Sequence, residues 1–219
     1  MTSSSYELII KIIVPALGKT LFMVLATTVC AAILGFLMAV VIVLTDKDGM
    51  RPNKYICETL STLVNIIRSF PFIILMVSII PLTRFIMGTS IGEKAAIVPL
   101  TIAAAPYIAR IIETALKEVD KDLIEAAKSF GASDAQIVFK IMVVEAVPAI
   151  TSGITLAVIS ILGASAVAGI VGAGGLGAVA LSYGYQNFNE TLMYSTVFVI
   201  IILVQAIQTL GNFLYYKLK

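Results

Sequence analysis

The residues of this chain whose types and spacing suggest a specific role lie in one short polar segment, residues 125–131. Glu125 is followed by two small residues, Ala126 and Ala127, and the segment ends at Gly131. Glu125 offers a negative charge to a basic or helix-N-terminal site on another protein, and the two alanines permit close approach of a partner's backbone. These residue types suit the binding of another protein. Because the chain has no histidine, histidine-based catalysis and any metal site that needs histidine are excluded.

The flanking sequence predicts how this segment is held. Residues 121–130 read as a short amphipathic helix, because apolar residues recur at helical spacing. The predicted apolar face consists of Leu123, Ile124, Ala127 and Phe130. Gly131 stands where a helix ends, and Ser133 with Gln136 fits the capping box of a following helix. The segment is therefore predicted as helix, glycine turn and helix, which would act as a rigid lever.

The rest of the chain has the composition of a membrane protein. A mean hydropathy of +1.04 and an apolar fraction of 59%, with only 13% charged residues, lie far outside the averages for soluble proteins. A net charge of +2 is too small and too dispersed to indicate a nucleic-acid partner. The lipid bilayer explains the composition better, and the fold class is predicted to be all-α.

Five membrane-spanning helices are predicted. Four correspond to residues 21–44, 56–80, 95–112 and 191–214, and one lies inside the uncharged stretch 146–189. The first carries no charge and is long enough to cross a hydrocarbon core of about 30 Å at about 1.5 Å per residue. The stretch after Gly172 is rich in Gly, Tyr and Asn, so we expect one helix followed by an irregular, partly buried segment.

The distribution of basic residues predicts the orientation, since Lys and Arg are enriched in cytoplasmic loops. With the N-terminus outside, the internal group is Lys47, Arg51, Lys54, Lys117, Lys121, Lys128, Lys140, Lys217 and Lys219. The external group is only Lys11, Lys19, Arg84 and Lys94. The lever and the C-terminus are therefore expected inside. The first apolar run is too long for a secretory signal and is expected to stay as an anchor.

The lever and the residues that follow it resemble the coupling loop of bacterial ABC importer permeases. The family pattern is Glu-Ala-Ala, three residues, Gly, nine residues, Ile, one residue and Leu-Pro. Glu125, Ala126, Ala127, Gly131 and Ile141 fall on it. The final Leu-Pro is replaced by residues 143–144, Val-Val, which predicts a helix that is unbroken there.

Further segments resemble one subfamily, the methionine importer permeases. They are NIIRSFPFIIL (65–75), PLTR (81–84), GTSIG (88–92), AAIVPLT (95–101), AAPYIAR (104–110) and GAGGLG (172–177). The resemblance implies a type I importer permease fold, with an external segment at residues 1–15, a transmembrane domain at 16–211 whose coupling loop is about 117–136, and a cytoplasmic tail at 212–219. Glu125, Ala126, Ala127, Phe130 and Gly131 would be the coupling residues.

The same resemblance implies the partners and the cargo. These are a second copy of the chain, a cytoplasmic ABC ATPase homodimer that binds the ATP, and an extracytoplasmic methionine-binding protein in a bacterial cytoplasmic membrane. The cargo would be methionine, in its L and D forms. The chain itself would need no cofactor and would not be an enzyme.

A pathway for the cargo is predicted where two of the membrane helices face each other. Small residues and a helix break give room and adaptable backbone. The candidates are Arg68 and Pro71 in the second helix and Ala164, Ser165 and Val167 in the fourth. For Arg68 a structural role, such as satisfying carbonyl groups freed by Pro71, remains open. Arg110 and Glu113 are spaced for a local ion pair.

Three other classes of membrane protein fit the sequence less well. A secondary carrier commonly shows internal repeats and charged relays at mid-membrane, and neither is found in the sequence. A channel would need a recognisable selectivity filter or a ring of charged side chains, and the sequence shows neither. An intramembrane enzyme would need a nucleophile with a base, and the chain has no histidine to act as that base. The G-x-G-x-x-G at residues 172–177 lacks the preceding strand and spaced acidic residue of a dinucleotide site, so it indicates flexible or close-packed backbone.

Overall fold

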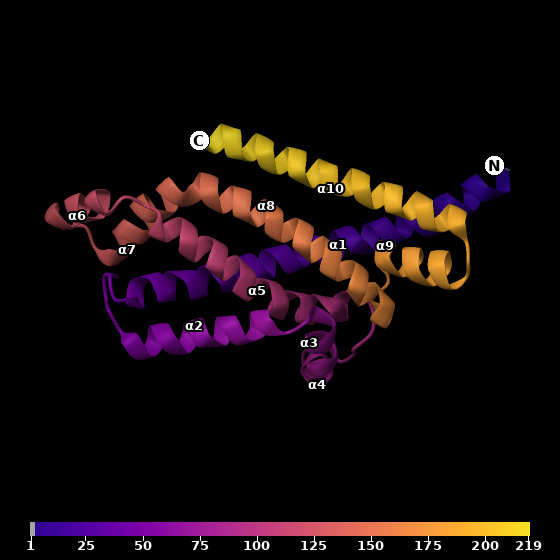
Figure 1. Ribbon diagram of the computed structural model, residues 1–219, viewed down its shortest axis with the longest axis horizontal. Helices are drawn as coiled ribbons and strands as arrows, with labels where there is room; N and C mark the ends of the chain where they lie inside the picture. The colour runs from indigo at the N-terminus through magenta and orange to yellow at the C-terminus, as the bar shows by residue number, and fades with distance from the viewer. Residues whose placement is uncertain (1–2) are drawn as a thin grey trace.

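The computed structural model describes residues 3–219, with side chains from Ile10 onward. Within that part all regular secondary structure is helical and there is no strand, which confirms the predicted fold class (Figure 1). The helices are α1 (Ser3–Thr45), α2 (Lys54–Ser69), α3 (Phe72–Ser78), α4 (Ile80–Met87), α5 (Glu93–Lys117), α6 (Lys121–Ser129), α7 (Asp134–Ile137), α8 (Val143–Ala168), α9 (Gly175–Ala178) and α10 (Glu190–Leu218). Three π-helical turns occupy Val138–Met142, Gly169–Ala173 and Val179–Gln186.

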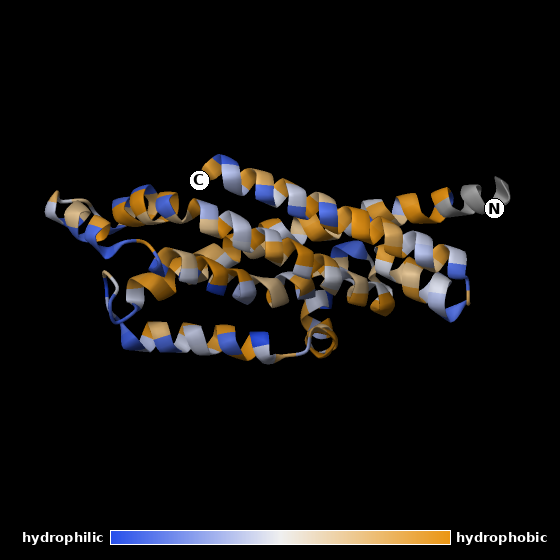
Figure 2. Ribbon diagram, turned by 45° about the horizontal axis from the view of Figure 1, so that its top comes forward, coloured by the Kyte–Doolittle hydropathy of each residue, from blue (hydrophilic) through white to orange (hydrophobic). Residues whose placement is uncertain are grey.

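The long helices run along the longest axis of the molecule, so the chain has two distinct ends. Helices α6 and α7 lie with the α1–α2 connection at one end, here called the α6 end (Figure 1). The N-terminus and the turn before α10 lie at the opposite end. Hydrophobic residues dominate the long helices, whereas hydrophilic residues gather at the connections at both ends (Figure 2). The distribution is that of a protein whose middle lies in hydrocarbon.

Four helical segments of the described chain are long and apolar enough to cross a membrane by themselves. They are Ile10–Thr45, Glu93–Lys117, Asp134–Ala173 and Glu190–Leu218. The second predicted span is instead a bent pair, Lys54–Ser69 and Phe72–Ser78, with an angle of 106° between its parts. The count therefore agrees with the predicted five only when this pair is taken as one span.

Pro71 explains the bend. A residue before proline is pushed out of the helical region, and Phe70 has the extended angles φ −76° and ψ 131°. Helix α2 ends there, and α3 begins with Pro71 as its N-cap residue. Helices α3 and α4 consequently turn aside at the middle of the molecule, where Figure 1 shows them below α5.

Helix α5 forms the centre of the fold, packed between α1 and α8. Its buried side chains include Ile108, Ile112 and Leu116, which join one core cluster with residues of α1 and α8. The approach to α1 is close, because a Cβ added at Gly35 would lie 2.8 Å from the Ala105 carbonyl oxygen. Small residues at helix crossings permit such packing in a membrane, so α5 holds the other elements at fixed distances.

The segment after α8 differs from the prediction of an irregular stretch. The chain breaks at Gly172 (φ +99°) and Gly174 (φ +77°), and is then helical again from Gly175 to Gln186. The prediction of irregular backbone was therefore wrong, because glycines that admit positive φ create a sharp turn between helices rather than a loop. Partial burial is confirmed, since the segment Gly175–Ala178 has buried residues.

The helix ends do not coincide with the expected domain boundaries. Helix α1 runs unbroken through residues 15 and 16, and α10 runs unbroken through residues 211 and 212. Residues 1 and 2 of the expected external segment lie outside the described residues. The division into 1–15, 16–211 and 212–219 thus stays a prediction about location relative to the membrane.

Candidate functional site

Helix α6 and its surroundings have the predicted form. Gly131 adopts a left-handed conformation with φ +76°, which ends the helix as a residue with a Cβ would not readily do. The capping box follows: the Ser133 N–H donates to Gln136 Oε1 at 2.8 Å, and the Gln136 N–H donates to Ser133 Oγ at 3.4 Å. The predicted helix, glycine turn and helix are therefore confirmed.

The apolar face of α6 is divided between two environments. Ile124 and Ala127 pack against the core cluster. Leu123 is instead 45% exposed and Phe130 is 92% exposed. The four residues of the predicted apolar face are therefore not all covered, because Leu123 and Phe130 lie on the flank of the helix that nothing in the described chain covers. Ala126, on the same flank, is also exposed.

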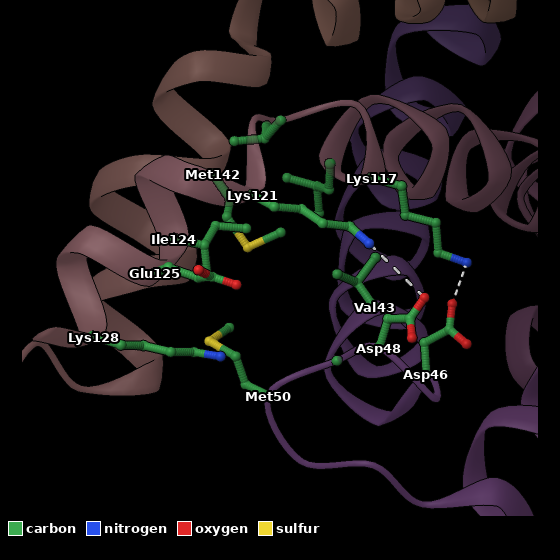
Figure 3. Close-up of a pocket in the computed structure, with 13 residues that line it drawn as sticks. Val43, Asp46, Asp48, Met50, Lys117, Lys121, Ile124, Glu125, Lys128 and Met142 are labelled. Carbon is green, nitrogen blue, oxygen red and sulfur yellow. Dashed lines mark ion pairs between the residues drawn. The ribbon is translucent and has the colours of Figure 1, made fainter.

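Glu125 lies on the other flank of α6, at a cavity. The cavity, of about 330 Å³, separates α6 from the α1–α2 loop, and Glu125 and Lys128 both line it. Figure 3 shows these two side chains on the α6 side and Met50 across from them. Glu125 is exposed, so its carboxylate is open to a group that enters between the helix and the loop.

The α1–α2 loop, residues 46–53, is tied to its surroundings by ion pairs. Arg51 Nε lies 2.5 Å from Asp134 Oδ2 at the start of α7, and Lys121 of α6 lies 3.9 Å from Asp48. Lys117, at the end of α5, lies 2.6 Å from Asp46. Its ammonium group, by donating a hydrogen bond, lowers the pKa of Asp46 below the ordinary value. Asp46 is thus held as a carboxylate.

Behind this loop lies a buried acid, Glu113, whose side chain is 7% exposed. Arg110 Nη1 lies 2.6 Å from one carboxylate oxygen, which confirms the predicted local pair, and Lys117 Nζ lies 2.9 Å from the other. Arg110 Nη2 also donates to Asn65 Oδ1 at 3.0 Å and to the Ser61 carbonyl at 3.3 Å. These bonds connect α5 to α2.

Sequence reasoning missed most of this network. The spacing of Glu113 and Lys117 is a recognised ion-pair spacing on a helix and could have been used to find Lys117. The loop residues Asp46, Asp48 and Arg51 read only as a charged turn, because nothing in a single sequence indicates which distant side chain each one contacts.

The predicted pathway residues are brought together in part. Arg68 of α2 and Ala164 of α8 line one cavity of about 290 Å³, together with Tyr107 of α5. Arg68 is exposed, and the structural role suggested for it, satisfying carbonyl groups freed by Pro71, stays a prediction. Pro71 is exposed at the bend.

The other two predicted pathway residues lie elsewhere on α8. Ser165 is buried, donates its hydroxyl hydrogen to the Leu162 carbonyl oxygen at 2.7 Å, and lines a different cavity with Thr20 of α1. Val167 is half-buried and does not line the cavity of Arg68. Among the residues described, no cluster of three acidic or cysteine side chains could hold a metal ion.

The fold and the site together define a multi-span helical membrane protein with an extramembrane lever between its central helices. Residues 42–219 match the family described as "Binding-protein-dependent transport system inner membrane component". This match covers most of the chain, which therefore belongs to that family.

Two relatives and two solved structures are similar to the chain. A probable D-methionine transport system permease protein MetI of Vibrio cholerae is 45% identical over 92% of this chain and 89% of its own length. The methionine import system permease protein MetP of Bacillus subtilis is 43% identical over 77% and 76%. A chain of the MetNI methionine ABC transporter, solved in inward-facing conformations, is 40% identical and covers both chains fully with a TM-score of 0.94. An amino acid ABC transporter with a TM-score of 0.74, at 20% identity, shares the fold.

Proposed function

We propose that this chain is the membrane-spanning permease subunit of an ATP-driven importer that carries methionine across the cytoplasmic membrane. Its cargo is inferred from the names of the relatives, which describe methionine or D-methionine transport. Its fold matches a methionine ABC transporter chain over the full length. The L and D enantiomers are both proposed as cargo.

The observation that carries the proposal is the exposed apolar flank of α6, formed by Leu123, Ala126 and Phe130. Phe130, the C-cap residue of α6, is 92% exposed although its side chain is large and aromatic. Exposed apolar patches rimmed by polar residues mark protein–protein contacts, and aromatic side chains often dominate their binding energy. This flank therefore suits the surface of a partner ATPase.

The five coupling residues have different parts in this docking surface. Ala126 and Phe130 provide the contact, while Ala127 holds α6 on the core. Gly131 sets the angle between α6 and α7 through its left-handed backbone. Glu125 faces the cavity beside α6, where it offers a negative charge to a basic group of the ATPase.

The assembly contains two copies of this chain, two ATPase subunits that bind the ATP, and an extracytoplasmic methionine-binding protein. A paired ATPase presents two equivalent surfaces, so a symmetric assembly needs two coupling helices related by a two-fold axis. The α6 end and the C-terminus face the cytoplasm and the N-terminus faces outside, in agreement with the basic residues near α6. The chain is the translocation subunit and has no cofactor of its own.

The pathway is proposed to pass the cavity of Arg68 and Ala164. The cavity lies beside the bend at Pro71, where backbone released from a helix can adapt to cargo. Ser165 and Val167 lie further along α8, and their contact with cargo requires a conformation in which this part of α8 faces the second copy.

The test is to purify the chain with its ATPase, add the binding protein, and measure uptake of labelled L- and D-methionine in vesicles. Uptake should require ATP and should persist when ion gradients are dissipated. Uptake that continues without ATP but stops when the gradients are dissipated would identify a secondary carrier. Failure of any ATPase to co-purify would also contradict the proposal.

A further inference from the structure

Charged side chains of the α1–α2 loop form ion pairs with α5, α6 and α7. Asp46 pairs with α5, Asp48 with α6, and Arg51 with α7. A cavity of about 330 Å³ lies between the loop and α6, and Figure 3 shows two of these pairs beside it. The ion pairs bridge this space, while Met50 of the loop and Ile124 of α6 both pack against the core cluster.

From Asp46 the connection continues into the protein. Lys117 bridges Asp46, at 2.6 Å, and Glu113, at 2.9 Å. Glu113 in turn holds Arg110 at 2.6 Å. Each of these contacts is short enough to be a charge-assisted hydrogen bond, the stronger and more directional kind.

Arg110 carries the connection across to α2 by donating to the Asn65 side chain and the Ser61 carbonyl. Arg68, three residues beyond Asn65 on the same helix, lines the cavity of about 290 Å³ with Ala164. Polar contacts joined by the backbone of the loop thus run from α6 and α7, through Asp46, Lys117 and Glu113, to the helix that borders this cavity.

The contacts in this series differ in burial. Lys121 and Asp48 are 75% and 66% exposed, and exposed pairs contribute little to stability. The Glu113 side chain is 7% exposed and is the shared acceptor of two cations. Without its charge, Arg110 and Lys117 would repel each other and lose their common partner, and removing one member of a buried pair is costly.

We propose that Glu113 is a positioning residue for energy coupling. It joins the α1–α2 loop to α2 through Lys117 and Arg110, so that a displacement of α6 and α7 by the ATPase moves the end of α2 with it. Ion pairs suit this purpose because they fix relative position and can re-form after a displacement. The inference rests on the proposed function and adds the route by which movement reaches the pathway.

The experiment compares wild type with Glu113→Gln in the reconstituted complex with ATPase and binding protein. The substitution keeps the shape of the side chain and removes its charge. ATPase co-purification should be unchanged, while methionine transported per ATP hydrolysed should fall about 2- to 30-fold, the range typical of lost coupling between sites. Glu58→Gln is the matched control, since Glu58 is 65% exposed and pairs with Lys54 on its own helix. It should keep the wild-type ratio.

The ratio separates positioning from a merely structural role. If uptake and hydrolysis fall together in Glu113→Gln and the ratio stays at the wild-type value, the proposal is overturned. Should that variant fail to insert, the pair Asp46→Asn and Arg51→Gln removes two loop contacts outside the hydrocarbon core. A lower ratio in this double variant supports the proposal, and a wild-type ratio overturns it.

A different outcome would contradict the proposed function itself. If the wild-type complex shows no ATP-dependent methionine uptake, the importer assignment falls, whatever the variants do. If wild type transports and the variants keep its ratio, only the role of Glu113 falls.

Discussion

Different interactions stabilise the two ends of the molecule. At the α6 end, ion pairs from the α1–α2 loop surround a cavity. At the opposite end the glycine-rich segment packs backbone against backbone: a Cβ added at Gly177 would lie 2.3 Å from Ala166 Cα. A buried hydrogen bond from the Leu176 N–H to Thr20 Oγ1, at 2.9 Å, joins the same segment to α1.

This difference indicates which end is built to move. Close-packed backbone resists displacement steeply, because atoms already in contact cannot approach further, and this holds for the contact of Gly177 with Ala166 although a cavity of about 220 Å³ lies beside it. Exposed ion pairs are individually weak and tolerate rearrangement, and a cavity leaves room for it. The α6 end is therefore the adjustable part and the opposite end the fixed part, which is the arrangement that a lever acting on a rigid bundle requires.

The largest effect is expected for Phe130→Ala. Phe130 is exposed in the free chain, so its removal should leave the stability of the chain unchanged. If it is an anchor for the ATPase, its loss should weaken ATPase binding by about 2 kcal/mol or more. The measurement is the affinity of the purified ATPase for each permease variant in detergent.

Phe188→Ala provides the control from the other end of the molecule. Phe188 is 89% exposed, so the same chemical change is made at a similar exposure. It should leave ATPase affinity at the wild-type value. Equal losses in the two variants would remove the functional distinction between the ends.

A smaller effect, on stability, is expected for Gly177→Ala. The added methyl group would overlap the backbone of Ala166, and overpacking of this kind costs about 1–3 kcal/mol. Thermal unfolding in detergent should show a lower midpoint. Gly163, which lines the same cavity as Gly177, is the control: Gly163→Ala meets nothing within 4 Å and should be neutral or slightly stabilising. A wild-type midpoint for Gly177→Ala would mean that the opposite end is not rigidly packed.

The contrast between the ends also explains what the sequence could predict. The helix, the Gly131 turn and the capping box of the α6 region follow from local spacing, and all were predicted. The exposure of Phe130 was not, because helical periodicity marks an apolar side chain without saying whether this chain or another protein covers it.

For the opposite end, partial burial was predicted correctly, but the backbone conformation was not. The glycines of this segment suggested irregular structure, yet the positive-φ residues Gly172, Gly174 and Gly175 form a short break between helices, while Gly177 is needed for space. A single sequence does not distinguish a glycine that bends the chain from one that admits a neighbour. The bend of the second span was indicated by Pro71, but its angle depends on packing against α5 and α8.

A pH experiment tests the ion pairs of the α6 end. Lys117, by its hydrogen bond, lowers the folded-state pKa of Asp46 below the ordinary value of 3.8. The stabilisation from this pair is therefore fully present above about pH 4 and disappears as the pH falls through the folded-state pKa. Asp46→Asn should lower the unfolding free energy by about 1 kcal/mol at neutral pH.

The difference between wild type and Asp46→Asn should remain constant from pH 7 to about pH 4 and shrink below it. Thermal unfolding of both proteins across this range supplies the measurement. A difference that grows on acidification would have the wrong sign for a carboxylate held by Lys117. Asp48→Asn, at a carboxylate that is 66% exposed, should have a smaller effect at neutral pH.

The smallest effect is expected for the Arg51–Asp134 pair. Its distance of 2.5 Å is short, but the Arg51 side chain is 77% exposed, so solvent screens the attraction. A double-mutant cycle with Arg51→Gln and Asp134→Asn should give a coupling energy of about 0.2–1 kcal/mol. The coupling should decrease at high salt, because exposed pairs are screened by mobile ions. A coupling energy of several kcal/mol that ignores salt would show the α6 end to be as firmly fixed as the glycine-rich end, and the contrast between an adjustable and a rigid region would fail.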